Sequence, residues 1–232
     1  PCRNPGQPLN DGNPVHEGGP RVIGVIDYGA GNIRSITRGL EAAGAEVFVA
    51  QRGTDLAGAD AIVLPGVGHA GQLMKSLQDR GFDRAVHDAV DADTPFLGIC
   101  VGLQIMFGDQ EEGNTRGLGL LDGEVRHLPR ELKTPHIGWS QVTAVTDSPF
   151  GPAGTSDHFY FVHSYAASNP DANAVVATTD YGVTYPSVVI KDHLWGCQFH
   201  PEKSSTAGIA FLRTFVNYVE AHLPARKAIA SR

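Results

Sequence analysis

A cysteine between two glycines is the residue of this sequence best placed for nucleophilic chemistry. In residues 94–104, TPFLGICVGLQ, a short apolar run leads into Cys100, and residues compatible with a helix follow. A strand, a sharp turn and a helix in this order form a nucleophile elbow, which exposes the side chain at its apex. Gly98 and Gly102 suit that crowded turn because glycine has no Cβ. The pattern predicts a reactive thiol, and a buried, inert cysteine is the alternative for this stretch alone.

Two backbone N–H groups are candidates for an oxyanion hole, which stabilises the negative charge of a tetrahedral intermediate. The elbow would aim the N–H of Val101 at the same point as the exposed sulfur, and a helix beginning there would stabilise a thiolate through its dipole. The string PGVG at 65–68 ends another apolar run, and its two glycines would let the N–H of Val67 turn toward the same point. An ordinary turn is the alternative for PGVG on its own.

A base for the thiol and an acid to orient that base occur in the string QFHPE at 198–202. His200 and Glu202 are two residues apart at the end of an apolar run. The carboxylate could therefore bond one imidazole nitrogen and leave the other for the thiol, as in a catalytic triad. A surface turn is the alternative for this string alone. Cys197 lies within the apolar run and is interpreted as a core residue.

These residues need a framework that brings them together. Strand-like apolar runs in the first half of the chain lie at 21–27, 46–50, 61–64 and 96–99. Helical spacing of apolar residues occurs at 33–43 and at about 72–90. From Gly123 onward strand-like runs follow at 124–128, 140–146, 158–166, 173–179, 187–190 and 194–199, before a final helix at about 205–221.

This order of elements predicts one α/β domain at 21–232. Its sheet would be mixed and mostly parallel, flanked by helices, with antiparallel hairpins in the C-terminal half. Residues 1–20 are rich in Pro, Gly and Asn and include Cys2 and His16. They are expected to form a disordered or tag-like extension, and they lack the apolar core of a signal peptide.

Composition narrows the class of protein. The 232 residues carry a formal charge of -7, which argues against a general nucleic-acid binder. No apolar run approaches the ~20 residues that a membrane helix needs. The three cysteines lack the spacing of a zinc site or a disulfide framework, which favours a cytoplasmic location. His127, His158 and His193 also lack ligand spacing, so no metal site is predicted.

Taken together, the three motifs resemble those of the class I, or triad, glutamine amidotransferases. The matching strings are PGVG at 65–68, GICVGLQ at 98–104 and QFHPEKS at 198–204. In that family the cysteine attacks the side-chain amide of glutamine, and a thioester forms as ammonia leaves. The resemblance implies that Cys100 is the nucleophile, that His200 is the base and acid, and that Glu202 orients His200. It implies no cofactor.

Further strings narrow the resemblance to a branch of the family that passes ammonia to a separate cyclase subunit in a heterodimer. They are IDYGAGNIRS at 26–35, EG at 112–113, PHIGW at 135–139 and YFVHSY at 160–165. By this resemblance the substrate glutamine would be held by Gly68, Gln104, Glu112, His163, Ser164 and Tyr165. The cyclase, a (β/α)₈ protein acting on a phosphoribulosyl-formimino ribonucleotide, would lie against Asn32, Trp139, Tyr160 and Lys203.

Three other functions fit parts of the pattern. A sister amidotransferase could serve the pyridoxal phosphate, anthranilate or GMP pathways, although the strings HIGW and YFVHSY disfavour it. A non-catalytic interaction protein could keep the fold with Cys100 as a relic, although the complete triad and both glycine turns argue against a relic. A stand-alone cysteine peptidase could act on γ-glutamyl bonds. Glutamine hydrolysis stimulated by a partner would separate these alternatives.

Overall fold

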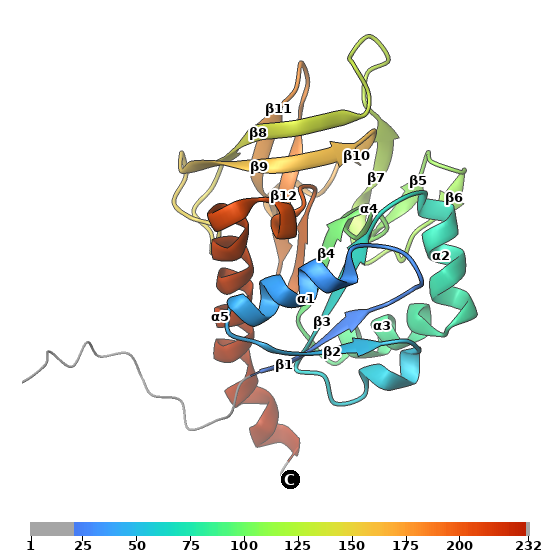
Figure 1. The fold of residues 1–232 in the computed structure, drawn as a ribbon, viewed down its shortest axis with the longest axis vertical. Coiled ribbons are helices and arrows are strands. Elements are labelled where there is room, and N and C mark those ends of the chain that lie inside the picture. The colour runs from blue at the N-terminus through green and yellow to red at the C-terminus, as the bar shows by residue number, and fades with distance from the viewer. Residues whose placement is uncertain (1–20, 231–232) are drawn as a thin grey trace, which may run out of the picture.

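The computed structural model describes residues 21–230, which form a large mixed sheet and a smaller second sheet (Figure 1). The predicted extension at 1–20, with Cys2 and His16, lies outside the described residues. The nine strands of the large sheet, in spatial order, are β2 (Glu46–Ala50), β1 (Val22–Ile26), β3 (Ala61–Gly66), β4 (Phe96–Cys100), β13 (Leu194–Cys197), β12 (Thr184–Lys191), β11 (Val175–Asp180), β8 (His136–Ala144) and β9 (Ser156–His163).

The large sheet has a parallel half and an antiparallel half. Strands β2, β1, β3, β4 and β13 pair in parallel. Strands β12, β11, β8 and β9 extend the sheet through antiparallel pairs. The predicted mixed α/β sheet with C-terminal hairpins is confirmed. Because the parallel strands share one carboxyl edge, the segments that follow β3, β4 and β13 meet there.

Helices cover the sheet on both sides. They are α1 (Ile33–Ala42), α2 (Ala70–Asp79), α3 (Phe82–Asp91), the single turn α4 (Val101–Gln104) and α5 (Ser205–Ala230), with short 3-10 helices η1 (Gly53–Leu56), η2 (Ala172–Ala174) and η3 (Pro201–Lys203). Helices α1 and α5 pack together at the left of Figure 1, and α2 and α3 lie at its right. None of the described helices is long and apolar enough to cross a bilayer.

Two predicted elements are each divided in the structure. The helix expected at about 72–90 is two helices, because Gly81 adopts a left-handed φ of 70° between them. The strand expected at 158–166 breaks at Ser164, where the chain leaves β9 and enters the small sheet. That sheet, whose β5 and β6 were not predicted, consists in spatial order of β10 (Tyr165–Ser168), β7 (Leu121–His127), β5 (Phe107–Gln110) and β6 (Thr115–Arg116).

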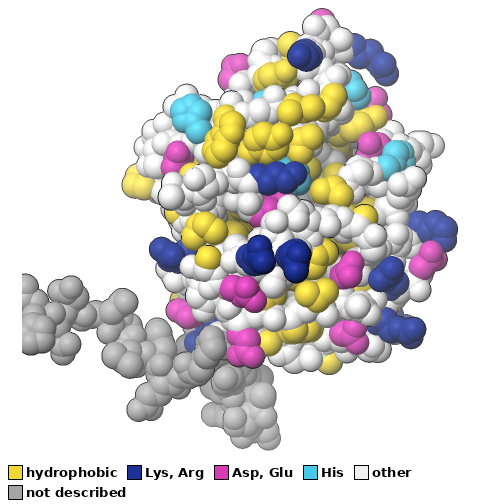
Figure 2. Space-filling model, in the orientation of Figure 1, with side chains coloured by type: hydrophobic (Ala, Val, Ile, Leu, Met, Phe, Trp, Pro, Cys, Tyr) yellow, Lys and Arg dark blue, Asp and Glu magenta, His cyan; other side chains and the backbone are white. Residues whose placement is uncertain are grey.

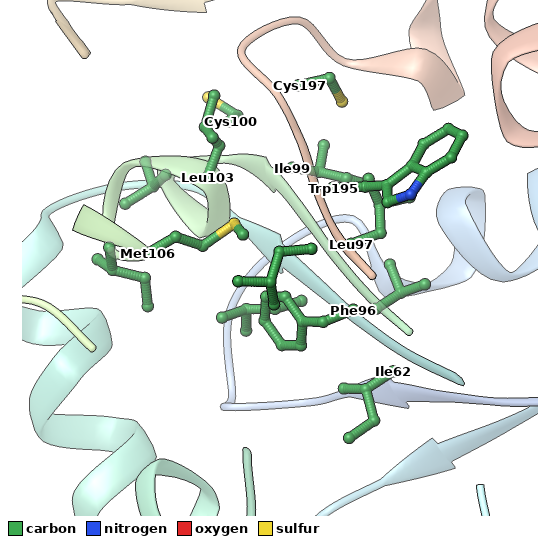
Figure 3. Close-up of a cluster of buried hydrophobic side chains, with 14 of the residues drawn as sticks. Ile62, Phe96, Leu97, Ile99, Cys100, Leu103, Met106, Trp195 and Cys197 are labelled. Carbon is green, nitrogen blue, oxygen red and sulfur yellow. The ribbon is translucent and has the colours of Figure 1, made fainter. Parts of the chain in front are cut away.

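Strand β4, which leads into the predicted elbow, is buried along its whole length. All five of its residues are buried, as expected for a central parallel strand covered on both faces. Phe96 and Leu97 lie among the core side chains below Cys100, close to Trp195 of the neighbouring β13 (Figure 3). The cysteine therefore stands on a rigid, fully packed part of the molecule.

Candidate active site

The predicted elbow is present at the end of β4. Cys100 has φ of 55° and ψ of -112°, a conformation that residues with side chains rarely adopt. Close packing holds it there: a Cβ on Gly66 would lie 2.3 Å from the backbone nitrogen of Gly102, and a Cβ on Gly102 would lie 2.0 Å from the carbonyl oxygen of Leu64. Such strain persists only where the surrounding structure enforces it. Helix α4 has a single turn, so its dipole contributes less than a full helix would.

His200 and Glu202 form a buried pair beside the elbow. The Nδ1 of His200 bonds Oε1 of Glu202 at 2.9 Å, and the two side chains are only 3% and 4% exposed. The Oγ of Ser204 donates to the carbonyl of His200 and accepts from the N–H of Tyr160, which fixes this segment against β9. The pair therefore has the fixed geometry that a base and its orienting acid require.

The electrostatics of His200 favour its protonated form. Burial alone would lower its pKa, but the contacts of its ring with Cys100 and Glu202 outweigh burial and raise the pKa to about 10. The Nε2 of His200 has no hydrogen-bond partner in the described part of the chain, and both His200 and Cys100 line one cavity. The arrangement suits a thiolate beside an imidazolium that can give its proton to a leaving group.

That cavity gathers the residues expected to bind a substrate. Its volume is about 230 Å³. Besides Cys100 and His200, its wall contains the predicted residues Val67, Gly68, Val101, Gln104, Glu112, His163, Ser164 and Tyr165, together with Pro135 and Val162, which were not predicted. Within residues 21–230, no group of three or more His, Cys, Asp and Glu side chains could hold a metal ion.

Two polar side chains of the wall are already partly engaged. The Nε2 of Gln104 donates to the carbonyl of Tyr165 at 2.7 Å and to Oε1 of Gln198 at 3.1 Å, so both of its hydrogens are used. Gln104 can therefore offer a ligand only its oxygen, as an acceptor. Glu112 accepts from the N–H of Ala70 at 2.7 Å, at the start of α2. Acceptors of this kind suit the ammonium group of an amino acid.

The second predicted oxyanion donor is engaged elsewhere in this structure. The N–H of Val67 donates to the hydroxyl of Tyr28 at 2.9 Å, and the same hydroxyl donates to the carbonyl of Val67 at 3.2 Å. Tyr28 is buried and lies in the string IDYGAGN, but nothing in that string signals this contact. Val67 is flanked by Gly66 and Gly68, and Gly68 has φ of 85°, so a peptide flip is sterically possible. The oxyanion role of Val67 stays a prediction for the flipped state.

His163 belongs to a buried hydrogen-bonded chain that the sequence did not reveal. Its Nδ1 bonds the carbonyl of Tyr165 at 2.9 Å, and its Nε2 bonds the hydroxyl of Tyr185 at 3.1 Å. That hydroxyl also contacts Nδ1 of His136, whose ring stacks on Tyr181. Burial lowers the pKa of His163 to about 3, so its ring is neutral at physiological pH. The cavity thus holds two histidines with opposite pKa shifts.

Of the residues predicted to face a partner, Trp139 and Tyr160 lie on the β8–β9 surface, and none of the four belongs to the cavity wall. Trp139 and Tyr160 are opposite each other, with ring centroids 6.2 Å apart, and Nζ of Lys203 lies 5.8 Å from the Tyr160 centroid. Ile137 and Trp139 are 59% and 52% exposed. Figure 2 shows a band of hydrophobic side chains over these two strands. Asn32 is exposed at the start of α1.

Comparison with known proteins adds independent evidence. The glutamine amidotransferase class-I family model matches residues 24–218. Imidazole glycerol phosphate synthase subunit HisH of Bacillus subtilis is 43% identical over 201 residues, covering 84% of this chain and 95% of that protein. The subunit of the same name from Symbiobacterium thermophilum is 47% identical over 194 residues, covering 83% of this chain and 91% of that protein.

Solved structures agree on the fold. The crystal structure of a glutamine amidotransferase has a TM-score of 0.70 at 20% identity, covering 85% of this chain and 98% of its own. PurLQS from Thermotoga maritima has a TM-score of 0.70 at 18% identity, covering 86% of this chain and 99% of its own. At these identities the likeness concerns the fold alone.

The lowered pKa of His163 predicts a specific loss of stability in acid. An unfolded histidine titrates near 6.5, so the neutral ring stabilises the fold fully above that pH, and the stabilisation is lost as pH falls toward the folded pKa of about 3. Between pH 7 and pH 4 the lowered pKa of His163 should reduce the free energy of unfolding by roughly 2–3 kcal/mol. Urea unfolding of the wild type and of His163→Gln at several pH values would measure the difference. Parallel pH curves for the two proteins would contradict the prediction.

Proposed function

This chain belongs to the class-I glutamine amidotransferase family, and we propose that it is the glutaminase subunit of imidazole glycerol phosphate synthase, which works in the cytoplasm in histidine biosynthesis. The observation that carries the chemistry is the convergence of Cys100 and the His200–Glu202 pair on one cavity. Relatives named as this subunit match most of the chain at over 40% identity. The free thiols of Cys100 and Cys197 are consistent with a reducing compartment.

The proposed reaction is hydrolysis of the glutamine side-chain amide. The thiolate of Cys100 attacks the δ-carbon, and a C–S bond forms while the carbonyl oxygen becomes an oxyanion. His200 gives its proton to the amide nitrogen, the C–N bond breaks, and ammonia leaves a thioester. Neutral His200 then takes a proton from water, whose oxygen attacks the thioester. Glutamate departs as the C–S bond breaks, and the thiolate and imidazolium are restored.

The residues of the cavity wall support the proposed roles in holding glutamine. The oxygens of Gln104 and Glu112 would accept from the α-ammonium group, because the donor capacity of Gln104 is spent inside the protein. Gly68, His163, Ser164 and Tyr165 would complete the glutamine site. The N–H groups of Val101 and of a flipped Val67 would bind the oxyanion.

The β8–β9 surface is the proposed docking site of the cyclase subunit. Exposed Trp139 and half-buried Tyr160 offer aromatic anchors of the kind common at interfaces, and Lys203 adds a charge beside them. Lys203 immediately follows Glu202 in η3, so this surface adjoins the triad. A cyclase docked on this surface, with Asn32 at the edge of the interface, could receive ammonia from the active site before the ammonia escapes to water. The cyclase would use it to form imidazole glycerol phosphate and AICAR from PRFAR.

A glutaminase assay with stepwise additions tests this function. The isolated chain should hydrolyse glutamine slowly, cyclase alone should help modestly, and cyclase with its ribonucleotide should give a large rise in turnover. The reason is that the N–H of Val67 is held by Tyr28 until a partner shifts the equilibrium. Cys100→Ala is the inactive control. Full activity of the lone chain, indifferent to both additions, would make it an independent glutaminase.

The triad predicts unequal losses at its two buried members. In the stimulated assay His200→Ala should lower kcat by about 10²–10⁴-fold, because the proton carrier is removed. Glu202→Gln should cost less, since it removes only the group that orients the ring and stabilises imidazolium. Circular dichroism would establish that both variants fold. A larger loss in Glu202→Gln than in His200→Ala would overturn the assigned roles.

The Tyr28 contact predicts a gain of activity without the partner. Tyr28→Phe removes both hydrogen bonds to Val67, each of the order of 0.5–1.5 kcal/mol, so the flipped peptide should become more populated. Basal glutaminase activity should therefore rise by about two- to tenfold, and stimulation by cyclase and nucleotide should shrink. Tyr218→Phe, which removes a tyrosine hydroxyl bonded to the carbonyl of Asp192, is the matched control and should leave basal activity unchanged. Lower basal activity in Tyr28→Phe would contradict this.

A further inference from the structure

A fully buried glutamine, Gln198, lies directly behind the sulfur of Cys100. Its Nε2 is 3.7 Å from Sγ, and its side chain is absent from the cavity wall. Burying a side-chain amide in the apolar run LWGCQF is costly unless its oxygen and NH₂ group form hydrogen bonds. A polar residue inside an otherwise apolar run is the signal by which the sequence could have singled it out.

A backbone carbonyl determines which end of the Gln198 amide, oxygen or NH₂, faces the sulfur. The carbonyl of Tyr165 can only accept, so the end of the Gln104 side chain that lies 2.7 Å from it must be the NH₂ group. The same nitrogen lies 3.1 Å from the Gln198 side chain, which must therefore present its oxygen to Gln104. The NH₂ group of Gln198 consequently faces the sulfur of Cys100.

The carbonyl of Tyr165 also determines which ring nitrogen carries the proton in His163 and in His136. His163 must carry its proton on Nδ1 to donate to Tyr165, so its Nε2 accepts from the hydroxyl of Tyr185. That hydroxyl in turn accepts from Nδ1 of His136, and Nε2 of His136 accepts from Ser140. Each group in this chain is thereby fixed as a donor or an acceptor in each of its hydrogen bonds. The network holds the Tyr165 carbonyl in place.

The sulfur of Cys100 lies between an acceptor and a donor. The carbonyl of Val162, 3.8 Å from Sγ, can accept from a neutral thiol but would repel a thiolate. Gln198 has the opposite preference, because an N–H donor stabilises negative charge on sulfur. In a site this buried, the imidazolium of His200 and the amide of Gln198 both favour the thiolate.

We propose that Gln198 is a catalytic residue of the proposed glutaminase reaction, which donates a hydrogen bond to the thiolate of Cys100. Gln104 is then a positioning residue, since its NH₂ group determines which end of Gln198 meets the sulfur. The inference rests on Cys100 being the nucleophile. It predicts that loss of the Gln198 donor changes the pH dependence of thiol reactivity, which a merely structural role would not do.

Alkylation of Cys100 by iodoacetamide, followed from pH 5 to pH 10, tests the proposal without using glutamine. Peptide mapping separates Cys100 from Cys2 and Cys197. In Gln198→Leu the alkylation rate at pH 6 should fall about tenfold, and its pH midpoint should move upward, because less thiolate is present. Gln198→Glu keeps the shape of the side chain but places a carboxylate near the sulfur. The pH midpoint of alkylation in this variant should therefore move upward at least as far as in Gln198→Leu.

Gln110→Leu is the matched control. Gln110 is buried and bonds the carbonyls of Gln104 and Phe107, without contact to the sulfur. Its alkylation midpoint should equal that of the wild type. An unchanged midpoint in both folded Gln198 variants, or an equal shift in Gln110→Leu, would overturn the proposal. A wild type that lacks glutaminase activity even with cyclase and nucleotide, yet shows the Gln198-dependent midpoint, would instead refute the proposed function.

Discussion

The close contact between the end of β3 and the turn after Cys100 is the constraint on which the site depends. Gly66 is in register with Cys100 and lies against the backbone of Gly102, where any Cβ would collide. This contact holds Cys100 in its strained conformation, and Val67 and Val101 line the same cavity. A larger residue at either glycine would separate the two segments, so the predicted nucleophile and the predicted oxyanion donors depend on the same packing.

Burial acts on the two cavity histidines in the same direction, and their partners decide the outcome. His163 has only neutral partners, so burial prevails and the ring stays unprotonated. His200 lies between a thiol and a carboxylate, and these contacts exceed the cost of burial. In the proposed reaction His200 would therefore carry the proton, while His163 is a neutral part of the cavity wall.

In the proposed function, the turn after β1 would control the reaction. Tyr28 in that turn binds both polar groups of Val67, and four residues later Asn32 lies exposed at the start of α1. A partner that docks on the β8–β9 surface and reaches Asn32 would therefore touch the same short segment that holds the Val67 peptide. In the proposed function, activity and docking would be linked in this way through a few local hydrogen bonds.

The sequence by itself determined the fold class and predicted the catalytic residues, because each depends on local patterns. The elbow around Cys100 needs glycines at fixed spacing, the His200–Glu202 pair is two residues apart, and the alternating strands and helices follow from apolar periodicity. At Gly81 and Ser164 the error lay in where an element ends, whereas strands β5 and β6 were missed altogether.

Only the tertiary structure decided which polar groups meet across the sheet. Tyr28 and Val67 are 39 positions apart, and Gln198 and Cys100 are 98 apart. Their contacts follow from strand order and register, which bring β1 beside β3 and β13 beside β4. No local pattern encodes such a pairing, because it depends on how all the intervening elements pack. The contact of Tyr28 with the predicted oxyanion donor and the contact of Gln198 with Cys100 therefore became visible only in the folded chain.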